Sequence, residues 1–488
     1  MNRFLAMSRT SAIYIWFAFS MGTIACSFSG DDSSDTGDDS SDPVYEPLLL
    51  SVVLETPERS PLTRRVTVSL REPAEVRFEY WQEDGLRFER EFALQTVEEQ
   101  LPLIGLVAGQ NSYLVVHVDL EGEQDQSEVI EFQTADLEFE LPVVLAEGSD
   151  ETPNGGMFLF GALNSQEFES DRYFWGVDRR GEVVWALDTG EHPPVSGAAI
   201  EAVGDNLFVY RSERLVRFVN GFGETVSQIG LSFNPNHDVA LLPNGNVIVV
   251  EYKQELRNLD LWGEFLFAWD VLREVNPAGE IVWSWDISEH LDVNRMPEGL
   301  IFKDGKLEWS HVNSVEYLEE TDQLLISVRN QSWVLLVDHK TGEVVWRLGR
   351  GGDFSLAGED WFKGQHDATL QSDGSIMVFD NGNIQQAVVP SRVARYMLDT
   401  ENFEAELVWS YDLEHGYKSM GGARSLVDGG TVIAAGGTRR SGAPLEIIEL
   451  DVLGEEVWRM GLEGEEGDYL VYRAIPFVYA EVLPEELE

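Results

Sequence analysis

A short unit recurs along most of the chain, and its repetition constrains the fold more than any other feature. The unit is a turn followed by an apolar strand that ends in tryptophan. RRGEVVW, PAGEIVW, KTGEVVW, FEAELVW and LGEEVW end at Trp185, Trp283, Trp346, Trp409 and Trp458, and a degenerate copy, GFGETVS, ends at Ser227. Consecutive copies lie about 40 to 65 residues apart, the length of one blade of a β-propeller. Six copies therefore predict an all-β, six-bladed propeller over residues 142–488, with the tryptophans packed between neighbouring blades.

The residues before the repeat follow a different pattern. Between 47 and 141, the segments RRVTVSL, AEVRFEYW, SYLVVHVDL and SEVIEFQTA alternate apolar and polar positions. This period of two is typical of half-buried strands. Their order resembles the last strands of a fibronectin type III domain. We therefore expect a small fibronectin-III-like β-sandwich over 47–141, in front of the propeller.

Residues 1–26 resemble an export signal. Arg3 and Arg9 precede the apolar run AIYIWFAFSMGTIA, which is short for a membrane span and ends at Cys26. The segment TIAC resembles a bacterial lipobox, so Cys26 is predicted to be lipidated, and Ser27 favours the outer membrane. An ordinary secretory signal is the alternative. Residues 27–46 are acidic and of low complexity, which predicts a disordered tether. The expected location is the periplasm, at the outer membrane, with a lipid anchor as the sole membrane contact.

The charge balance excludes one class of partner. The chain has 34 Lys+Arg against 87 Asp+Glu, a formal charge of -53. Such an acidic surface repels a phosphate backbone, so nucleic acid is not an expected partner. Because Cys26 is the one cysteine, no disulfide can form within the chain, and packing has to stabilise the fold.

A second unit, strand–turn–strand, begins with histidine in three places. HDVALLPNGNVIVV, HVNSVEYLEETDQLLISVR and HDATLQSDGSIMVF start at His237, His311 and His366. Each follows a copy of the first unit, and in a propeller such a segment becomes the innermost strand of the next blade. The three histidines are therefore expected at equivalent rim positions, facing the central channel. Asp238 and Asp367, which follow two of them, should point away and serve as structural or orienting groups.

Other polar residues are expected at the same rim. Arg329 ends the partner strand of the His311 hairpin and so returns to the end where His311 lies. Asn313 is two residues after His311, which predicts the same face of that strand. In the matching hairpin of the sixth blade, Arg424 or Ser425 could reach the channel, with an ordinary strand role as the alternative.

The residues alone leave three interpretations of this group open. The histidines could satisfy backbone groups at strand ends. They could hold a metal ion with water as the fourth ligand, although a guanidinium is poorly placed beside a metal unless an anionic substrate bridges the two. They could also transfer an anionic group, with a neutral imidazole as nucleophile and Arg329 as the clamp.

Four segments closely resemble bacterial arylsulfotransferases, in the same order: FNPNHDVALLPNGNVIVVEY, WSHVNSVEY, LLISVRNQSWVLLVDHKTGEVVWRLG and GQHDATLQSDGSIMVFDNGN. The resemblance covers most of the propeller half. It implies a catalytic propeller that moves a sulfuryl group from a phenolic sulfate ester to an acceptor phenol, with ping-pong kinetics and without a nucleotide donor, cofactor or metal. A homodimer is compatible with it.

The same resemblance implies the role of each residue. His366 becomes sulfated, His237, His311 and Arg329 are the other catalytic residues, and Asn313 binds substrate. Arg424 is a further substrate-binding candidate, from its place in the sixth hairpin rather than from the resemblance. Alternatives from other classes are a quinoprotein-like or metal-dependent propeller enzyme, because DHKTGEVVW resembles the tryptophan-docking repeats of quinoproteins, and a non-catalytic propeller scaffold.

Overall fold

The computed structural model describes residues 24–25, 46–83, 86–137, 143–148, 156–164, 173–190, 200–203, 207–259, 263–296, 302–303, 305–382, 389–436, 444–463 and 469–482. The predicted lipidation site Cys26 lies outside these residues, as do nearly all of the predicted signal and tether. Ile24–Ala25 form the short strand β1. None of the described helices has the length and apolar character that a membrane crossing requires.

The chain is all-β, as predicted, and its described helical turns are short. They are α1 (Ile287–His290), η3 (Arg329–Gln331) and η4 (Ala357–Glu359). Of these, η3 follows the strand β25 (Gln323–Val328) directly and begins with the predicted site residue Arg329.

Two antiparallel sheets form the N-terminal part. One has the order β1-β2-β3-β6 and the other the order β39-β5-β4-β7-β8, with β9 also paired to β7. The further strands are β2 (Leu49–Glu55), β3 (Arg64–Leu70), β4 (Glu75–Gln82), β5 (Arg87–Ala93), β6 (Glu98–Leu103), β7 (Asn111–Leu120), β8 (Glu123–Gln126), β9 (Ile130–Gln133) and β39 (Glu481–Val482). Alternate residues of β3 and β4 are buried, so the period-two prediction is confirmed.

Six further sheets, here called sheets I to VI, are built from the rest of the described chain. Sheet I contains β11 (Gly156–Asn164), β12 (Tyr173–Asp178), β13 (Val183–Asp188), β37 (Tyr469–Val471) and β38 (Ile475–Val478). Sheet II contains β14 (Ile200–Ala202), β15 (Leu207–Ser212), β16 (Leu215–Asn220) and β17 (Thr225–Gly230). Sheet III contains β18 (Pro235–Leu241), β19 (Val247–Leu259), β20 (Gly263–Val275), β21 (Ile281–Asp286), β22 (Phe302–Lys303) and β23 (Lys306–Glu308).

The last three sheets contain the remaining strands. Sheet IV contains β24 (Val312–Leu318), β25 (Gln323–Val328), β26 (Trp333–Asp338) and β27 (Val344–Leu348). Sheet V contains β28 (Ser355–Leu356), β29 (His366–Leu370), β30 (Ile376–Asp380), β31 (Arg392–Asp399) and β32 (Glu404–Asp412). Sheet VI contains β10 (Val143–Gly148), β33 (Gly422–Ser425), β34 (Thr431–Ala435), β35 (Leu445–Leu450) and β36 (Glu456–Glu463).

Each copy of the tryptophan repeat forms a strand in a different sheet. The copies correspond to β13, β17, β21, β27, β32 and β36, one in each of sheets I to VI. Two of their tryptophans contact the turn of a neighbouring sheet. Trp458 donates from Nε1 to the carbonyl of Arg179 at 2.6 Å, and the ring of Trp283 lies 4.8 Å from that of His339.

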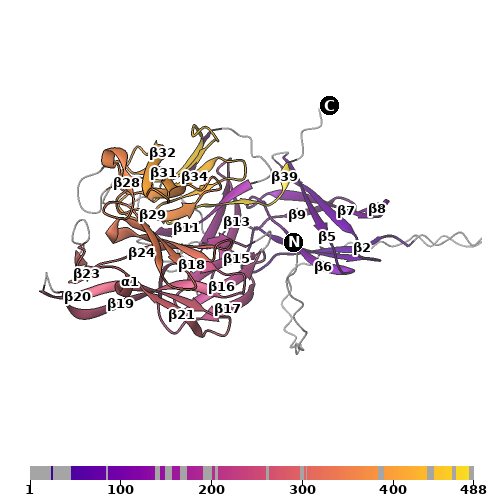
Figure 1. Cartoon of the computed structure of the whole chain (residues 1–488). Helices are drawn as coiled ribbons and strands as arrows, with labels where there is room; N and C mark the ends of the chain where they lie inside the picture. The colour runs from indigo at the N-terminus through magenta and orange to yellow at the C-terminus, as the bar shows by residue number, and fades with distance from the viewer. Residues whose placement is uncertain are drawn as a thin grey trace, which may run out of the picture.

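Both ends of the chain pair with distant strands. β10 pairs with β36 of sheet VI, whereas β37 and β38 pair with β11 of sheet I. β39 then pairs with β5, so the yellow C-terminal strand returns to the indigo N-terminal sheets (Figure 1). Strands from the beginning and the end of the chain therefore hold the first and last of the six sheets together.

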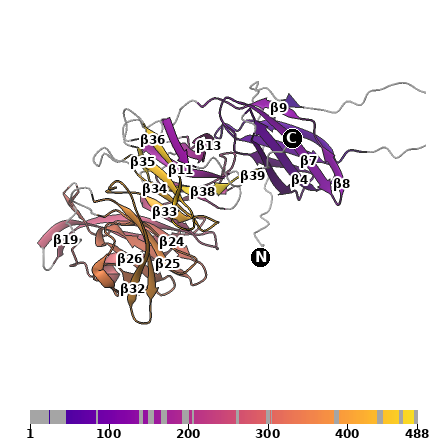
Figure 2. The ribbon, with the colours of Figure 1, turned by 90° about the horizontal axis from the view of Figure 1, so that it is seen from above.

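The N-terminal sheets lie to one side of the six sheets in both views (Figures 1 and 2). One apolar cluster nevertheless crosses from them into sheets I and II, since Val66, Phe78 and Leu114 belong to the same buried group as Trp185 and Phe208. Full burial of one such side chain contributes about 1.5–3 kcal/mol, so this shared cluster anchors the two parts to each other.

Strands β18, β24, β29 and β33, one from each of sheets III to VI, lie side by side, and a side chain of each of the first three accepts from a backbone N–H group of the next. The bonds are Val315 N–H to Asp238 (3.1 Å), Ala368 N–H to Ser314 (3.1 Å) and Ala423 N–H to Asp367 (3.1 Å). Asp238 and Asp367 therefore have the structural role expected of them. This arrangement places the strands that carry the three histidines next to one another.

Candidate active site

The structure brings the three predicted histidines to corresponding ends of adjacent strands. His237 lies in β18, His311 directly precedes β24, and His366 is the first residue of β29. The rings of His237 and His311 have centroids 4.6 Å apart. His366 is 2% exposed and lies close enough to both other imidazoles for a charge on one ring to affect the others.

A β-bulge accompanies each histidine. The pairing register shifts between Asn236 and Val239 in β18, between Val312 and Ser314 in β24, and between His366 and Thr369 in β29. His237 (φ 49) and His311 (φ 58) have left-handed backbone conformations, which are uncommon for residues other than glycine and gather at functional sites. A bulge redirects a side chain out of the strict alternation of a strand, so two-residue spacing does not by itself fix the relation between His311 and Asn313.

His366 is held at both ring nitrogens. Its Nδ1 lies 2.7 Å from Oδ1 of Asn381, and its Nε2 accepts from the backbone N–H of Met420 at 3.2 Å. Burial, with the nearby charge of Arg329 as the second cause, lowers the pKa of His366 well below its usual value. The imidazole is therefore neutral at neutral pH, as a nitrogen nucleophile has to be.

Arg329 begins η3 at the end of the His311 hairpin, as predicted, and its backbone N–H donates to the carbonyl of His311 at 3.1 Å. Its Nη1 donates to Asn330 at 2.9 Å and its Nη2 to the carbonyl of Lys418 at 3.0 Å, while its buried Nε has no partner among the described residues. Burial lowers the pKa of Arg329 to about 10, so the group stays cationic at neutral pH. Both hydrogen-bond partners are neutral oxygens, and the charge of Glu308 also acts on the guanidinium.

His237 and His311 differ in their surroundings. Burial, followed by the charge of His311, lowers the pKa of His237 well below its usual value, and its buried Nδ1 has no partner among the described residues. His311 is partly exposed, with its Nδ1 3.5 Å from a carboxylate oxygen of Glu308. A carboxylate at this distance stabilises an imidazolium. Glu308 therefore places a carboxylate beside the ring of His311.

The two predicted substrate-binding residues have different environments. Asn313 is fully buried and donates to the carbonyl of Gln365, the neighbour of His366, at 2.7 Å; its Oδ1 has no partner in the described part of the chain. Arg424 instead forms ion pairs with Asp367 at 2.9 Å and Glu201 at 3.7 Å. The structure therefore places Asn313 beside the histidine group. Arg424 pairs instead with the neighbouring carboxylates of Asp367 and Glu201.

Sequence reasoning missed several residues of the site, and the buried Tyr472 is one of them. Its ring centroid lies 6.2 Å from that of His237 and 6.2 Å from that of His366, and its hydroxyl donates to the backbone carbonyl of Asn313. Burial raises the pKa of Tyr472 well above its usual value, so it is a neutral phenol. It comes from the segment between β37 and β38, which no repeat signal connects to the histidines.

Arg473, the next residue, ties this segment in place. It is 3% exposed and pairs with Asp238 at 3.1 Å, Asp367 at 2.7 Å and also Glu201. These carboxylates raise its pKa well above the usual value against the opposing effect of burial. A buried charge is tolerated when it is paired in this way, so the C-terminal segment is fixed against the strands that carry the site.

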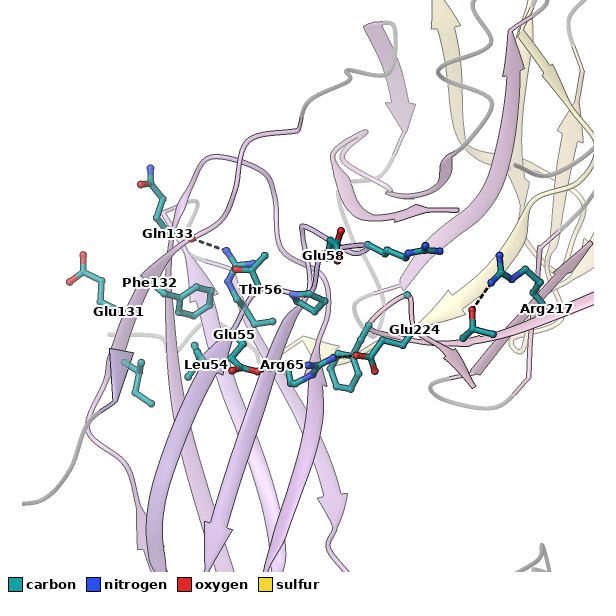
Figure 3. A pocket seen from close by; sticks show the side chains of 17 residues that line it. Leu54, Glu55, Thr56, Glu58, Arg65, Glu131, Phe132, Gln133, Arg217 and Glu224 are labelled. Atoms are coloured by element: carbon teal, nitrogen blue, oxygen red, sulfur yellow. Dashed lines mark hydrogen bonds and ion pairs between the residues drawn. The ribbon is translucent and has the colours of Figure 1, made fainter. Parts of the chain in front are cut away.

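A separate hollow of about 760 Å³ lies between the N-terminal sheets and strands β16 and β17 (Figure 3). Three of its arginines have partners: Arg65 pairs with Glu224, Arg217 donates to Thr225 at 2.9 Å, and Arg64 donates to the carbonyl of Gln133 at 2.8 Å. None of the predicted site residues lines it.

The described residues contain no group of three or more His, Cys, Asp or Glu side chains arranged to hold a metal ion. The histidine group is instead accompanied by a buried guanidinium and amide side chains.

The fold and this site define an all-β protein with a cluster of three imidazoles beside a buried guanidinium. The sequence model described as "Arylsulfotransferase (ASST)" matches residues 131–473, and the chain belongs to the arylsulfotransferase family. Two curated relatives, the arylsulfate sulfotransferases AssT of Escherichia coli O6:H1 and of Lelliottia amnigena, are each 25% identical to it over 152 residues. The match covers 25% of this chain and 25% of each relative, so it spans about a quarter of their length.

Among solved structures, a dihydro-haem d1 dehydrogenase matches 68% of this chain and 76% of its own at 10% identity and a TM-score of 0.30. A structure from Bacteroides caccae matches 85% and 95% at 10% identity and a TM-score of 0.32. These scores are too low to bear on architecture or function.

Proposed function

We propose that this protein transfers a sulfuryl group from a phenolic sulfate ester to an acceptor phenol, through a sulfated His366 and with ping-pong kinetics. The observation that supports this most directly is a neutral, buried imidazole beside a guanidinium that has N–H groups left for an anion. Family membership supports the same chemistry.

In the first half-reaction, Nε2 of His366 attacks the sulfur, the N–S bond forms and the S–O bond to the phenol breaks. Negative charge on the three sulfuryl oxygens and on the departing phenolate is what the protein has to stabilise. Arg329 donates to the sulfuryl oxygens from Nε and from the remaining N–H of each Nη. His311, as the imidazolium beside Glu308, gives its proton to the phenolate.

In the second half-reaction, the acceptor phenol occupies the place of the product. His311, now neutral, takes the phenol proton while the phenol oxygen attacks the sulfur and the N–S bond breaks. His366 returns to its neutral form, and the proton balance closes without a further reactant.

The proposed attack also calls for a movement before the first step. The lone pair of Nε2 accepts the N–H of Met420, and Lys418 accepts from Arg329 in the same loop. The donor therefore reaches His366 after Met420 withdraws. Gly421, with φ 98, is the adjacent position that permits an unusual backbone conformation.

The finer features of the fold and the location belong to the same proposal. Six sheets that each contain one copy of the repeat support a six-bladed propeller, and the two N-terminal sheets support a fibronectin-III-like sandwich. The sequence of residues 1–46 supports an exported protein that is lipid-anchored at Cys26 in the periplasm, at the outer membrane.

Steady-state transfer from p-nitrophenyl sulfate to phenol tests the activity. We expect p-nitrophenolate release that depends on the acceptor, with parallel lines in double-reciprocal plots at several acceptor concentrations. Acceptor-independent turnover would indicate a sulfatase, and a sequential pattern would rule out the covalent intermediate.

A further inference from the structure

Asn381 contacts the imidazole that the proposed mechanism uses. We infer that Asn381 is a positioning residue, whose side-chain oxygen holds His366 as the Nδ1–H tautomer and so leaves Nε2 as the nitrogen that accepts the sulfuryl group. The role in transfer rests on the proposed function, whereas the tautomer exists in the resting protein whatever the reaction.

The orientation of the Asn381 amide follows from its other contacts. Its Nδ2 donates to two backbone carbonyls, those of Tyr417 at 2.8 Å and Met420 at 2.9 Å. An amide nitrogen has two N–H groups and no acceptor capacity, so both are used here. The opposite atom, Oδ1, is therefore the one that faces Nδ1 of His366 at 2.7 Å.

An amide oxygen can only accept, so Nδ1 of His366 has to donate. In a neutral imidazole the other nitrogen then has the lone pair. A second, independent contact agrees, because the N–H of Met420 points at Nε2 from 3.2 Å and requires an acceptor there. The two contacts come from different parts of the chain, one directly after β30 and one from the loop before β33.

Register explains how Asn381 comes to this place. β29 and β30 pair so that His366 lies opposite Phe379. Asn381, two residues further along, thus returns to the end of the hairpin where His366 begins. It is 2% exposed, so its contact with Nδ1 is shielded from bulk solvent.

A neutral oxygen suits the chemistry better than a carboxylate would. When the N–S bond forms at Nε2, the ring becomes cationic and keeps its Nδ1–H, and the bond to Asn381 strengthens as the charge develops. Before attack, an amide does not favour the imidazolium as a carboxylate does. Asn381 thereby supports the intermediate without protonating the nucleophile.

The first test is ¹⁵N NMR of the full-length protein with labelled histidine, with the His366 signals assigned by comparison with His366→Gln. We expect a protonated Nδ1 and an unprotonated Nε2 at pH 7. The reverse tautomer, or an equal mixture of both, would overturn the inference. If the Nδ1–H tautomer is found but no sulfated enzyme ever forms, the positioning role of Asn381 stands and the proposed function fails.

The second test is Asn381→Asp, which keeps the shape and makes the acceptor anionic. The groups that face His366 are Arg329, His311, His237 and Tyr472, and none of them changes in this variant. The new carboxylate should hold His366 as the imidazolium. The rate of enzyme sulfation at pH 7 should therefore fall by about tenfold or more and recover as the pH rises.

Ser391→Ala is the matched control. Ser391 Oγ accepts from Tyr417 N–H at 2.8 Å and contacts the carbonyl of Asn381 at 3.3 Å, so this variant loosens the same loop without touching the imidazole. It should lower thermal stability but leave the pH profile unshifted. If Asn381→Asp shows the same pH profile as Ser391→Ala, the positioning role is wrong. If Asn381→Asp does not fold, the ¹⁵N NMR measurement of the His366 tautomer in the wild-type protein still tests the positioning role.

Discussion

Replacing Arg329 by alanine tests how the site stabilises the transferred group. Arginine has five N–H donors, and one on each Nη is bonded, to Asn330 and to the carbonyl of Lys418. Nε–H and one N–H on each Nη remain for the sulfuryl oxygens. Loss of one preorganised donor to developing charge typically costs about 2.7–4 kcal/mol, or roughly 10²–10³ in rate. We expect Arg329→Ala to slow enzyme sulfation by at least this factor.

The assay is single-turnover release of p-nitrophenolate with enzyme in excess and no acceptor. It isolates the first half-reaction, so product release does not mask the effect. Arg329→Lys keeps the charge without the planar fork and should lie between wild type and alanine.

A loss of folding has to be separated from a loss of catalysis, because Arg329→Ala also leaves the oxygens of Asn330 and Lys418 without their hydrogen-bond donor. Arg295→Lys is a suitable control, since Arg295 donates to the carbonyl of Gln331 in the same η3 turn at 3.0 Å and to that of Arg350 at 3.1 Å. It should retain the wild-type rate. If folded Arg329→Ala is sulfated within about threefold of the wild-type rate, Arg329 does not clamp the sulfuryl group. A threefold change is well below the tenfold change that about 1.4 kcal/mol of transition-state stabilisation produces.

Three further predictions follow from the same geometry. Glu308→Gln should remove the charge that supports protonated His311, so sulfation by esters of weakly acidic phenols should slow by about tenfold. p-Nitrophenyl sulfate, whose phenolate needs little protonation, should be much less affected, and equal losses for both donors would contradict the acid role. Gly421→Ala places a methyl group 2.6 Å from Phe379 at φ 98, so urea unfolding should show about 1–3 kcal/mol less stability, whereas unchanged stability would mean a different loop conformation. His366 stays neutral when folded but gains a proton when unfolded below pH about 6.5. Stability should therefore be unaffected above pH 7 and fall as the pH drops below 6.5, by up to about 1.4 kcal/mol per pH unit more than in His366→Gln; identical pH slopes would contradict a neutral buried His366.

The repeat allowed much of the fold to be predicted. Each tryptophan unit becomes a strand in its own sheet, because turn chemistry and alternation are local and act before tertiary contacts. Register within the repeat also predicted that His237, His311 and His366 lie at corresponding ends of adjacent strands. The return of Arg329 to His311 followed from antiparallel pairing alone.

The rest of the site depends on contacts that no local pattern encodes. Tyr472 reaches the histidines because the C-terminal segment pairs with β11, a partner more than 300 residues earlier in the chain. Glu308 lies in β23, which joins sheet III in parallel with β20. Asn381 could have been found, since hairpin register returns it to His366, but asparagine after a strand is also an ordinary turn residue.

A β-bulge removes the basis on which Asn313 was predicted to share a strand face with His311. The register shift in β24 interrupts the alternation on which that prediction rested. Bulges depend on how strands meet at the rim, and no residue type in HVNSVEY announces one.

Mass analysis of the protein after incubation with p-nitrophenyl sulfate, in the absence of any acceptor, tests the central claim most directly. The account predicts a gain of about 80 Da, one sulfuryl group per chain, on the peptide that contains His366. Addition of phenol should remove it with formation of phenyl sulfate, and His366→Gln should never acquire it. A folded protein that transfers sulfate without this adduct, or that has it on His237 or His311, would contradict the assignment of His366 as the residue that accepts the sulfuryl group.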